Sequence, residues 1–216
     1  MKKEILAILI LVGLFSLQNN IDIEDRNYGL ILGMDLKASG EWRATYSFAD
    51  LSKVAETQGK GAESVSLSIS GTSLEEIENK YNTFQDTELE YGHLKALIIG
   101  KSIIEDEEQY ENFMKEMTNS SEYSRNMLVF CADEALEVVK LDEETTGLLA
   151  DKLKRLEERH ISAKTITLKT VLQGYWEGKE VRVPSLRVYR GSPQFIGYET
   201  LPINKRDTSL ETSPIL

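Results

Sequence analysis

Few side chains in this sequence suit catalysis or covalent cross-linking. Cys131 is the single cysteine, so no disulfide can form within the chain and the fold must depend on its core. The two histidines, His93 and His160, stand far apart and give no metal-ligand spacing such as His-x-x-x-His. No Gly-x-Ser-x-Gly motif for a serine nucleophile occurs either. The sequence therefore predicts no metal and no cofactor, and it gives little support for an enzyme.

The chain is also short of positive charge. It carries 36 acidic and 25 basic residues, for a formal net charge of −11 at pH 7. A surface of this sign argues against nucleic-acid binding and against attachment to anionic lipid through a basic patch. The densest acidic run, residues 105–108, is expected to begin a helix, where carboxylates meet the positive end of the helix dipole.

One long apolar run is present, at the N-terminus. Residues 5–17 are almost entirely apolar and follow Lys2 and Lys3, a pattern typical of an export signal. The run is short for a membrane span, because at ~1.5 Å per residue it covers only about 20 Å of a hydrocarbon core roughly 30 Å thick. Residues 15–20 lack the A-x-A-like pattern of a cleavage site. We therefore expect residues 1–20 to form a signal or anchor segment that is uncleaved or weakly cleaved.

Four stretches of the body predict strands. Apolar and polar residues alternate over residues 42–48 and 65–69, which is typical of half-buried antiparallel strands. Residues 94–100 and 127–131 are short and apolar on both faces. This composition suits central strands that are covered on both sides, and it places Cys131 in the core.

Apolar residues at helical spacing predict helices between the strands. The first helix follows Thr72 or Ser73 as a cap, with Glu75 or Glu76 completing a capping box. Asp133 is expected to cap a later, short helix. The inward-facing residues of three helices are expected to be Leu74, Ile77, Tyr81 and Phe84; Tyr110, Phe113, Met114 and Met117; and Leu149, Leu153 and Leu156.

The C-terminal third is expected to hold two helices and a hairpin. One helix covers residues 144–159 with a solvated tail from Glu157 onward, and residues 167–175 fit a helix or a strand, with helix favoured. Turn-forming residues 190–193 separate two strand-like runs and predict a hairpin, with Pro184 at a strand start or edge.

The order of these elements predicts an α+β fold. Helices are interleaved between buried strands of a mixed β-sheet, and a C-terminal hairpin closes the domain. The division we expect is a signal or anchor segment at residues 1–20, the α+β domain at 21–203 and a polar, disordered tail at 204–216.

Four motifs in the same order resemble one family, the Ger(x)C spore germination proteins. The first is IEDRNY at residues 23–28 with LGMD at 32–35, and the second is YGHLKALIIG at 91–100. The others are SEYSRNMLV at residues 121–129, and VPSL at 183–186 with FIGY at 195–198. Each motif is short, and the specificity comes from their common register over residues 22–200.

The resemblance implies a non-enzymatic C subunit of a nutrient germinant receptor. Such a protein works at the outer face of the spore inner membrane with membrane-spanning A- and B-type subunits. Family members usually carry a lipid-modified cysteine just before the first motif, whereas residues 17–20 here are LQNN. A lipid anchor is therefore not expected, and residues 1–20 are expected to hold the domain at the membrane.

A second hypothesis is a membrane-tethered extracytoplasmic domain that binds a small ligand or a cell-wall fragment. Its candidate contact residues are Trp42, Tyr91 and His93. His93 lies at a junction where ligands often bind, although a structural histidine at a strand start is favoured. Gly33 and Asp35 are expected to be buried structure, because a glycine in a central strand indicates close backbone approach or a bulge.

Overall fold

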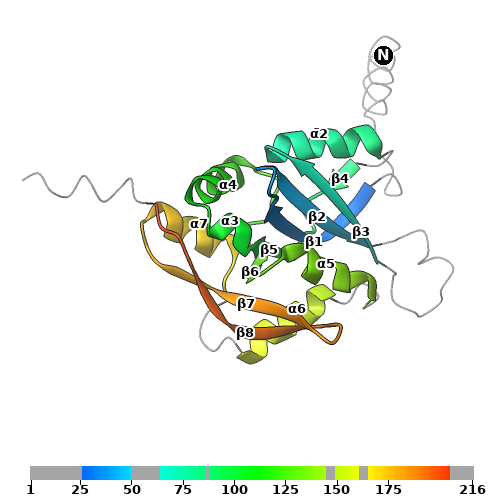
Figure 1. Ribbon diagram of the computed structural model, residues 1–216. Coiled ribbons are helices and arrows are strands. Elements are labelled where there is room, and N and C mark those ends of the chain that lie inside the picture. Colours follow the sequence, from blue (N-terminus) through cyan, green and yellow to red (C-terminus); the bar gives the residue numbers. More distant parts are fainter. Residues whose placement is uncertain (1–25, 50–63, 86–87, 145–148, 161–164, 205–216) are drawn as a thin grey trace, which may run out of the picture.

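A mixed β-sheet runs through the molecule and carries helices on both faces (Figure 1). The computed structural model describes residues 26–49, 64–85, 88–144, 149–160 and 165–204. The α+β class predicted from the sequence is confirmed, with interleaved helices and a hairpin at the end. The predicted anchor lies outside the described residues. So does the predicted tail, except for Asn204, which is buried.

The strand order across the sheet is β3-β2-β1-β5-β6-β7-β8, and β4 pairs with the start of β1. The strands are β1 Arg26–Leu36, β2 Trp42–Ala49, β3 Ser64–Gly71, β4 Glu88–Glu90, β5 Ala96–Gly100, β6 Leu128–Ala132, β7 Val181–Tyr189 and β8 Ser192–Leu201. β1, β5, β6 and β7 are parallel neighbours, whereas β1-β2-β3 and β7-β8 are antiparallel. The sheet therefore has a parallel centre and antiparallel ends.

Two groups of helices cover the two faces of the sheet. The helices are α2 Leu74–Phe84, α3 Lys101–Ile104, α4 Glu107–Asn119, α5 Ala135–Glu144, α6 Leu149–His160 and α7 Leu168–Trp176. Buried residues of α2, α3, α4 and α7 share one core with the sheet, and those of α5 and α6 share the other (Figure 1). Within the described segments, no helix combines the length and hydropathy that a membrane crossing requires.

The central strands send alternate side chains into the two cores, because successive Cβ atoms of a strand point to opposite faces. In β5, Leu97 and Ile99 join the core under α4, whereas Ile98 joins the core under α5. Cys131 is buried, as predicted, and burial raises the pKa of its thiol to about 11. The thiol therefore stays protonated at neutral pH, which fits a packing role.

Several predicted details near α2 need correction. Ser73 is the N-cap, and its hydroxyl accepts the N–H of Glu76 at 3.1 Å. The Glu76 carboxylate returns to the N–H of Thr72 at 2.8 Å, one residue before the position that a capping box requires. Phe84 was predicted to face inward but is 76% exposed, because the buried stripe of α2 ends one turn earlier, at Tyr81.

The C-terminal third also differs in detail. Of the helix predicted for residues 144–159, the structure describes α6 from Leu149 onward, Glu144 belongs to α5, and residues 145–148 lie outside the described residues. Glu157 is buried rather than solvated. Residues 168–176 form the favoured helix. Pro184 lies inside β7 rather than at its start, but the pairing of β7 with β6 begins only at the next residue, so Pro184 removes no hydrogen bond from that ladder.

Candidate functional site

The three predicted contact residues do not share a cavity. Trp42 is 1% exposed, and its indole Nε1–H donates to Oε1 of Gln109 at 2.9 Å. Tyr91 is buried beside Tyr123, with ring centroids 5.0 Å apart, whereas His93 is exposed. None of them lines any of three cavities that the structure forms from described residues, at the start of α2, beside Tyr110 and beside Lys95. Trp42 and Tyr91 thus serve packing, and a ligand contact by any of the three stays a prediction.

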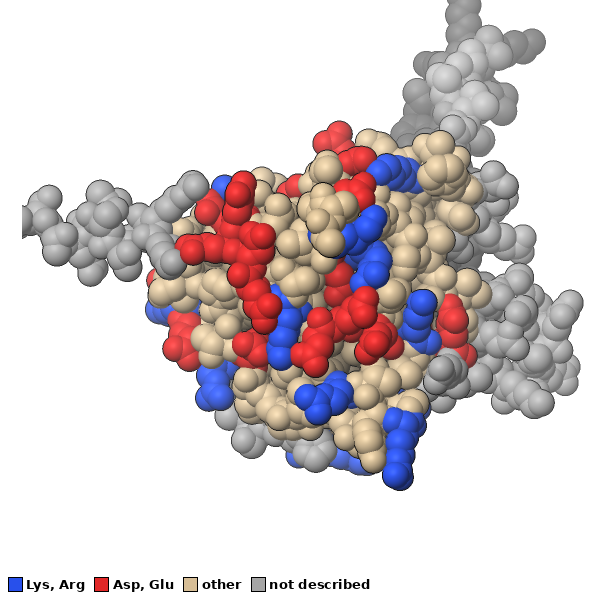
Figure 2. All heavy atoms as spheres, viewed as in Figure 1, with Lys and Arg blue, Asp and Glu red and all other residues tan. Residues whose placement is uncertain are grey.

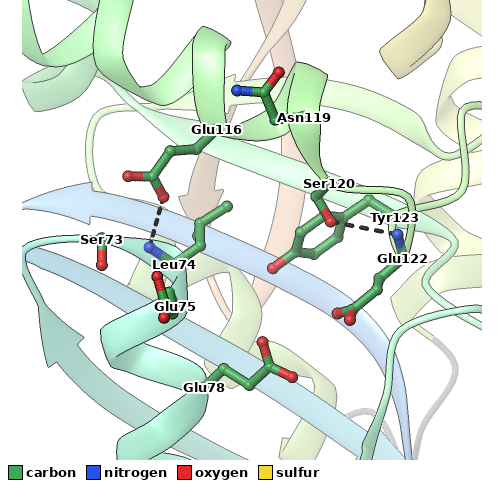
Figure 3. Close-up of a pocket in the computed structure, with 9 residues that line it drawn as sticks. All are labelled: Ser73, Leu74, Glu75, Glu78, Glu116, Asn119, Ser120, Glu122 and Tyr123. Atoms are coloured by element: carbon green, nitrogen blue, oxygen red, sulfur yellow. Dashed lines mark hydrogen bonds between the residues drawn. The ribbon is translucent and has the colours of Figure 1, made fainter.

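A groove of about 320 Å³ lies between the start of α2 and the end of α4. Figure 3 shows its lining residues, which are Ser73, Leu74, Glu75, Glu78, Glu116, Asn119, Ser120, Glu122 and Tyr123. Four of these lining residues are glutamates, and none of the nine is basic. We call this feature the acidic groove, and it is the main candidate site on this face of the sheet.

Two hydrogen-bonding residues set the shape of the acidic groove. Glu116 on α4 accepts the N–H of Leu74 at 2.6 Å, which ties α4 to the first turn of α2 (Figure 3). Arg125 donates to the carbonyl oxygens of Met117, Thr118 and Ser120 at 2.6, 2.8 and 2.9 Å. These carbonyls lie at the end of α4, where the helix leaves them without partners. Arg125 therefore caps α4 and fixes the loop that carries Tyr123.

The carboxylates of the acidic groove repel one another. Burial, with the charges of Glu122 and Glu75 nearby, raises the pKa of Glu78 above its ordinary value. Burial also raises the pKa of Glu116, against the opposing effect of its hydrogen bond from Leu74. A positively charged group would relieve this repulsion. In the part of the chain that the structure describes, no group of three or more histidine, cysteine or acidic side chains is arranged to hold a metal ion.

Tyr123, which lines the acidic groove, belongs to a cluster of three buried tyrosines. Tyr91 packs edge-on against Tyr123 and also against Tyr46, with centroids 6.2 Å apart in the second pair. Burial raises the pKa of all three phenols. They therefore stay neutral, and nothing in this arrangement supplies a base or a nucleophile for a reaction.

On the opposite face, Asp35 joins β1 to α5. Its carboxylate accepts the N–H groups of Ala135 and Leu136 at 2.7 and 3.0 Å, and it accepts from Nη2 of Arg43 at 3.1 Å. Asp35 is only 2% exposed, so these bonds form away from water. The predicted cap, Asp133, instead pairs with Nζ of Lys101 at 2.8 Å. Asp35, and not Asp133, therefore caps α5.

Glycines allow these elements to come close. A Cβ on Gly33 would lie 2.8 Å from Cγ2 of Val139 on α5, so the predicted close approach at Gly33 is confirmed. A Cβ on Gly100 would collide with the Asp35 carboxylate. Gly33 and Asp35 belong to the motif LGMD, and Gly100 belongs to YGHLKALIIG. The close contacts give a structural reason for these residue types in the two motifs.

The polar side of β2 faces α5 rather than water. Thr45 and Ser47 are fully buried, and Ser47 donates to the carboxylate of Asp142 on α5. Asp142 also accepts the N–H of Leu149 at 3.0 Å, which joins α5 to α6. The alternation in residues 42–48 thus marks an apolar core on one side of β2 and a polar helix contact on the other.

The comparisons with known proteins give one match. A family model described as the spore germination protein N-terminal domain matches residues 19–188. Searches among curated proteins and among solved structures found no significant match. The matched range runs from before β1 almost to the end of β7 and includes both faces of the sheet. It also contains the acidic groove and the Asp35 contact.

The fold and the match define a spore germination N-terminal domain in which the motif residues Asp35, Gly100 and Arg125 serve structural roles. The chain belongs to the Ger(x)C family of spore germination proteins. None of the four glutamates of the acidic groove was predicted from the sequence to belong to a binding site. They come from two helices and a loop, and on each helix they look like ordinary solvated positions.

Proposed function

We propose that this chain is a non-enzymatic subunit of a nutrient germinant receptor. It acts in spore germination through contacts with membrane-spanning A- and B-type subunits. The observation that carries the proposal is the family match over residues 19–188. The motif residues Asp35, Gly100 and Arg125 serve helix capping and close packing, so the proposal assigns them to the stability of the domain and not to a reaction.

The proposal places the domain on the extracytoplasmic face of the spore inner membrane. Residues 1–20 anchor it there through the apolar run that follows Lys2 and Lys3. No cysteine stands in residues 1–20, so this anchor uses no lipid-modified cysteine. The acidic surface suits this arrangement, because a domain that does not adhere to anionic lipid headgroups stays free to contact protein partners.

Deletion of the gene tests the proposal. Spores without it should lose or slow their response to at least one nutrient, and the full chain supplied in trans should restore that response. As a control, decoated spores treated with lysozyme should rehydrate at the normal rate, because this route bypasses nutrient sensing. The proposal would be contradicted if the parent spores contain the protein and the deletion spores still respond normally to every nutrient that triggers the parent.

A further inference from the structure

A cavity of about 420 Å³ lies beside α6, next to the starts of β5 and β6. Its volume is within the range of about 300–1,000 Å³ that ligand pockets occupy, so it can hold a group larger than a single ion. The lining includes Lys95 before β5, Leu128 at the start of β6, and Ala150, Lys154 and Glu157 on α6. The last three residues recur at helical spacing and therefore share one face of α6. We call this feature the Glu157 cavity.

The side chain of Glu157 is directed inward by its place on α6. Glu157 follows Leu149 and Leu153 at intervals of four residues, and both leucines are fully buried. Glu157 itself is only 6% exposed. An acid thus stands where the apolar stripe of the helix would continue. Burial of a carboxylate without a bonding partner costs free energy, so native proteins rarely keep one without a reason.

The carboxylate of Glu157 is unpartnered and open. No hydrogen bond or ion pair joins it to another residue that the structure describes. In the same part of the chain, the side-chain polar atoms that lack a partner and are also closed to solvent belong to Arg43, Tyr46, Ser64 and Tyr110. The oxygens of Glu157 are not among these closed atoms. The small exposed area of Glu157 therefore includes its carboxylate, on the side chain that lines the cavity.

The other charges around the cavity leave Glu157 uncompensated. Nζ of Lys95 lies 3.9 Å from the carboxylate of Asp151, and Nζ of Lys154 lies 4.0 Å from that of Glu158. These four residues line the same cavity, so two lysines stand against three acids. Figure 2 shows acidic and basic side chains interspersed on the face in view, which balances charge locally there. The Glu157 cavity, in contrast, is complementary to one additional positive charge.

The form of the site favours a guanidinium group over other cations. The described segments place no set of three or more acidic, histidine or cysteine side chains where it could hold a metal ion. A guanidinium donates two parallel N–H bonds to the two oxygens of one carboxylate, and it is more weakly hydrated than an ammonium. Leu128 and Ala150 supply apolar surface for its flat faces, and Asn126 and Thr165 supply side-chain oxygens for its remaining N–H groups.

We infer that the Glu157 cavity binds a guanidinium group, as found at the end of an arginine side chain. The guanidinium donates to both oxygens of Glu157 and gives this buried acid a charged partner. The inference goes beyond the receptor role proposed above and does not depend on it, because binding to this cavity is measured on the purified chain alone.

Calorimetric titration of the full chain in non-ionic detergent tests the inference. The probes are n-propylguanidinium, Nα-acetyl-arginine amide, Nα-acetyl-lysine amide and Nα-acetyl-citrulline amide, which has the shape of the arginine amide without its charge. The two guanidinium probes should bind, and the citrulline amide should not. The lysine amide should bind about tenfold more weakly than the arginine amide, because an ammonium cannot make the two parallel bonds. Tighter binding of the arginine amide than of n-propylguanidinium identifies an arginine of a protein partner, and equal binding identifies a site for the free group.

Two variants locate the binding. Glu157→Gln should weaken binding of the arginine amide about tenfold or more, because it removes the charge and one of the two acceptor oxygens. It should not lower the melting temperature, since no described residue loses a bond. Glu137→Gln makes the same charge change at an exposed residue of α5 outside the lining and should leave the affinity unchanged.

Three results would overturn the inference. The first is that neither guanidinium probe binds the folded chain. The second is that the lysine or citrulline amide binds as tightly as the arginine amide. The third is that Glu157→Gln, shown to be folded by its melting curve, binds the arginine amide as the parent does.

Discussion

The carboxylate of Asp35 occupies the space that a Cβ on Gly100 would need. Asp35 is the next-to-last residue of β1, and Gly100 is the last residue of the neighbouring strand β5. Because Gly100 has no side chain, the Asp35 carboxylate can lie over β5. There it accepts N–H groups from the first turn of α5. One acid and one glycine thus bring two parallel strands and a helix together.

Gly100→Ala should lower the free energy of unfolding by about 3 kcal/mol or more. The added methyl group meets both the Asp35 carboxylate and the carbonyl oxygen of Met34, which lies 3.0 Å from the ideal Cβ position and cannot move freely. Gly92→Ala is the control, because its Cβ would meet only the flexible carboxylate of Glu90. Urea denaturation of both variants measures the difference. Equal, small losses would contradict this explanation.

Asp35→Ala should cost about 2–3 kcal/mol, because the first N–H groups of α5 lose their buried acceptor, whereas Arg43 keeps its pair with Glu134. Asp35→Asn keeps one acceptor oxygen and should cost less. Asp133→Ala breaks only an exposed pair with Lys101 and should cost under about 1 kcal/mol. The reverse order, with Asp133→Ala the more harmful change, would make Asp133 the cap after all.

Arg125→Met should cost about 2–3 kcal/mol and loosen the end of α4, since three carbonyl oxygens lose a charged donor. Arg125→Lys should recover less than half of this loss, because an ammonium cannot reproduce the fork of a guanidinium. Hydrogen exchange of the last turn of α4 reads the local effect. Arg155→Met, at an exposed position on α6, should change neither quantity.

Two glutamates on α2 should respond to charge removal with opposite signs. The raised pKa of Glu78 means that the unfolded chain ionises first as pH rises, so ionisation of Glu78 destabilises the fold at neutral pH. Lys80 and Thr72 lower the pKa of Glu76 from 4.5 to about 2, so its charge stabilises the fold above pH 4.5. Glu78→Gln should therefore raise the melting temperature at pH 7, and Glu76→Gln should lower it.

The pH dependence separates these effects from general packing changes. The gain from Glu78→Gln should disappear below about pH 4.5, where the carboxyl is protonated in both the folded and the unfolded chain. The loss from Glu76→Gln should fade as the pH drops from 4.5 toward 2. Melting curves between pH 2 and pH 7 measure both trends. Shifts that do not vary with pH would contradict the electrostatic account.

The regular elements could be predicted because their signals are local. The alternation around Trp42 and the helical spacing of Phe113 and Met117 each depend on neighbours a few residues away, and both predictions are confirmed. Phe84 was misplaced because periodicity gives the direction of a side chain but not where the sheet beneath the helix ends. The very short β4 and α3 give too few residues for any period and were not predicted.

The sites could not be predicted because their residues meet only in the fold. Asp35 lies 100 residues from Ala135, whose N–H it accepts, so the adjacent Asp133 looked like the better cap. Glu78 and Glu116 reach the acidic groove from two helices that the sequence does not relate. The motif residues, by contrast, could be recognised from the sequence, and the structure gives Asp35, Gly100 and Arg125 their physical roles.

The most direct test of the receptor role is affinity purification of the tagged full chain from detergent-solubilised spore inner membranes. We predict that A- and B-type membrane-spanning subunits copurify with it in amounts comparable to the chain itself, and that an untagged strain yields neither. Recovery of the chain from the inner membrane without either subunit, or from the soluble fraction alone, would contradict the account.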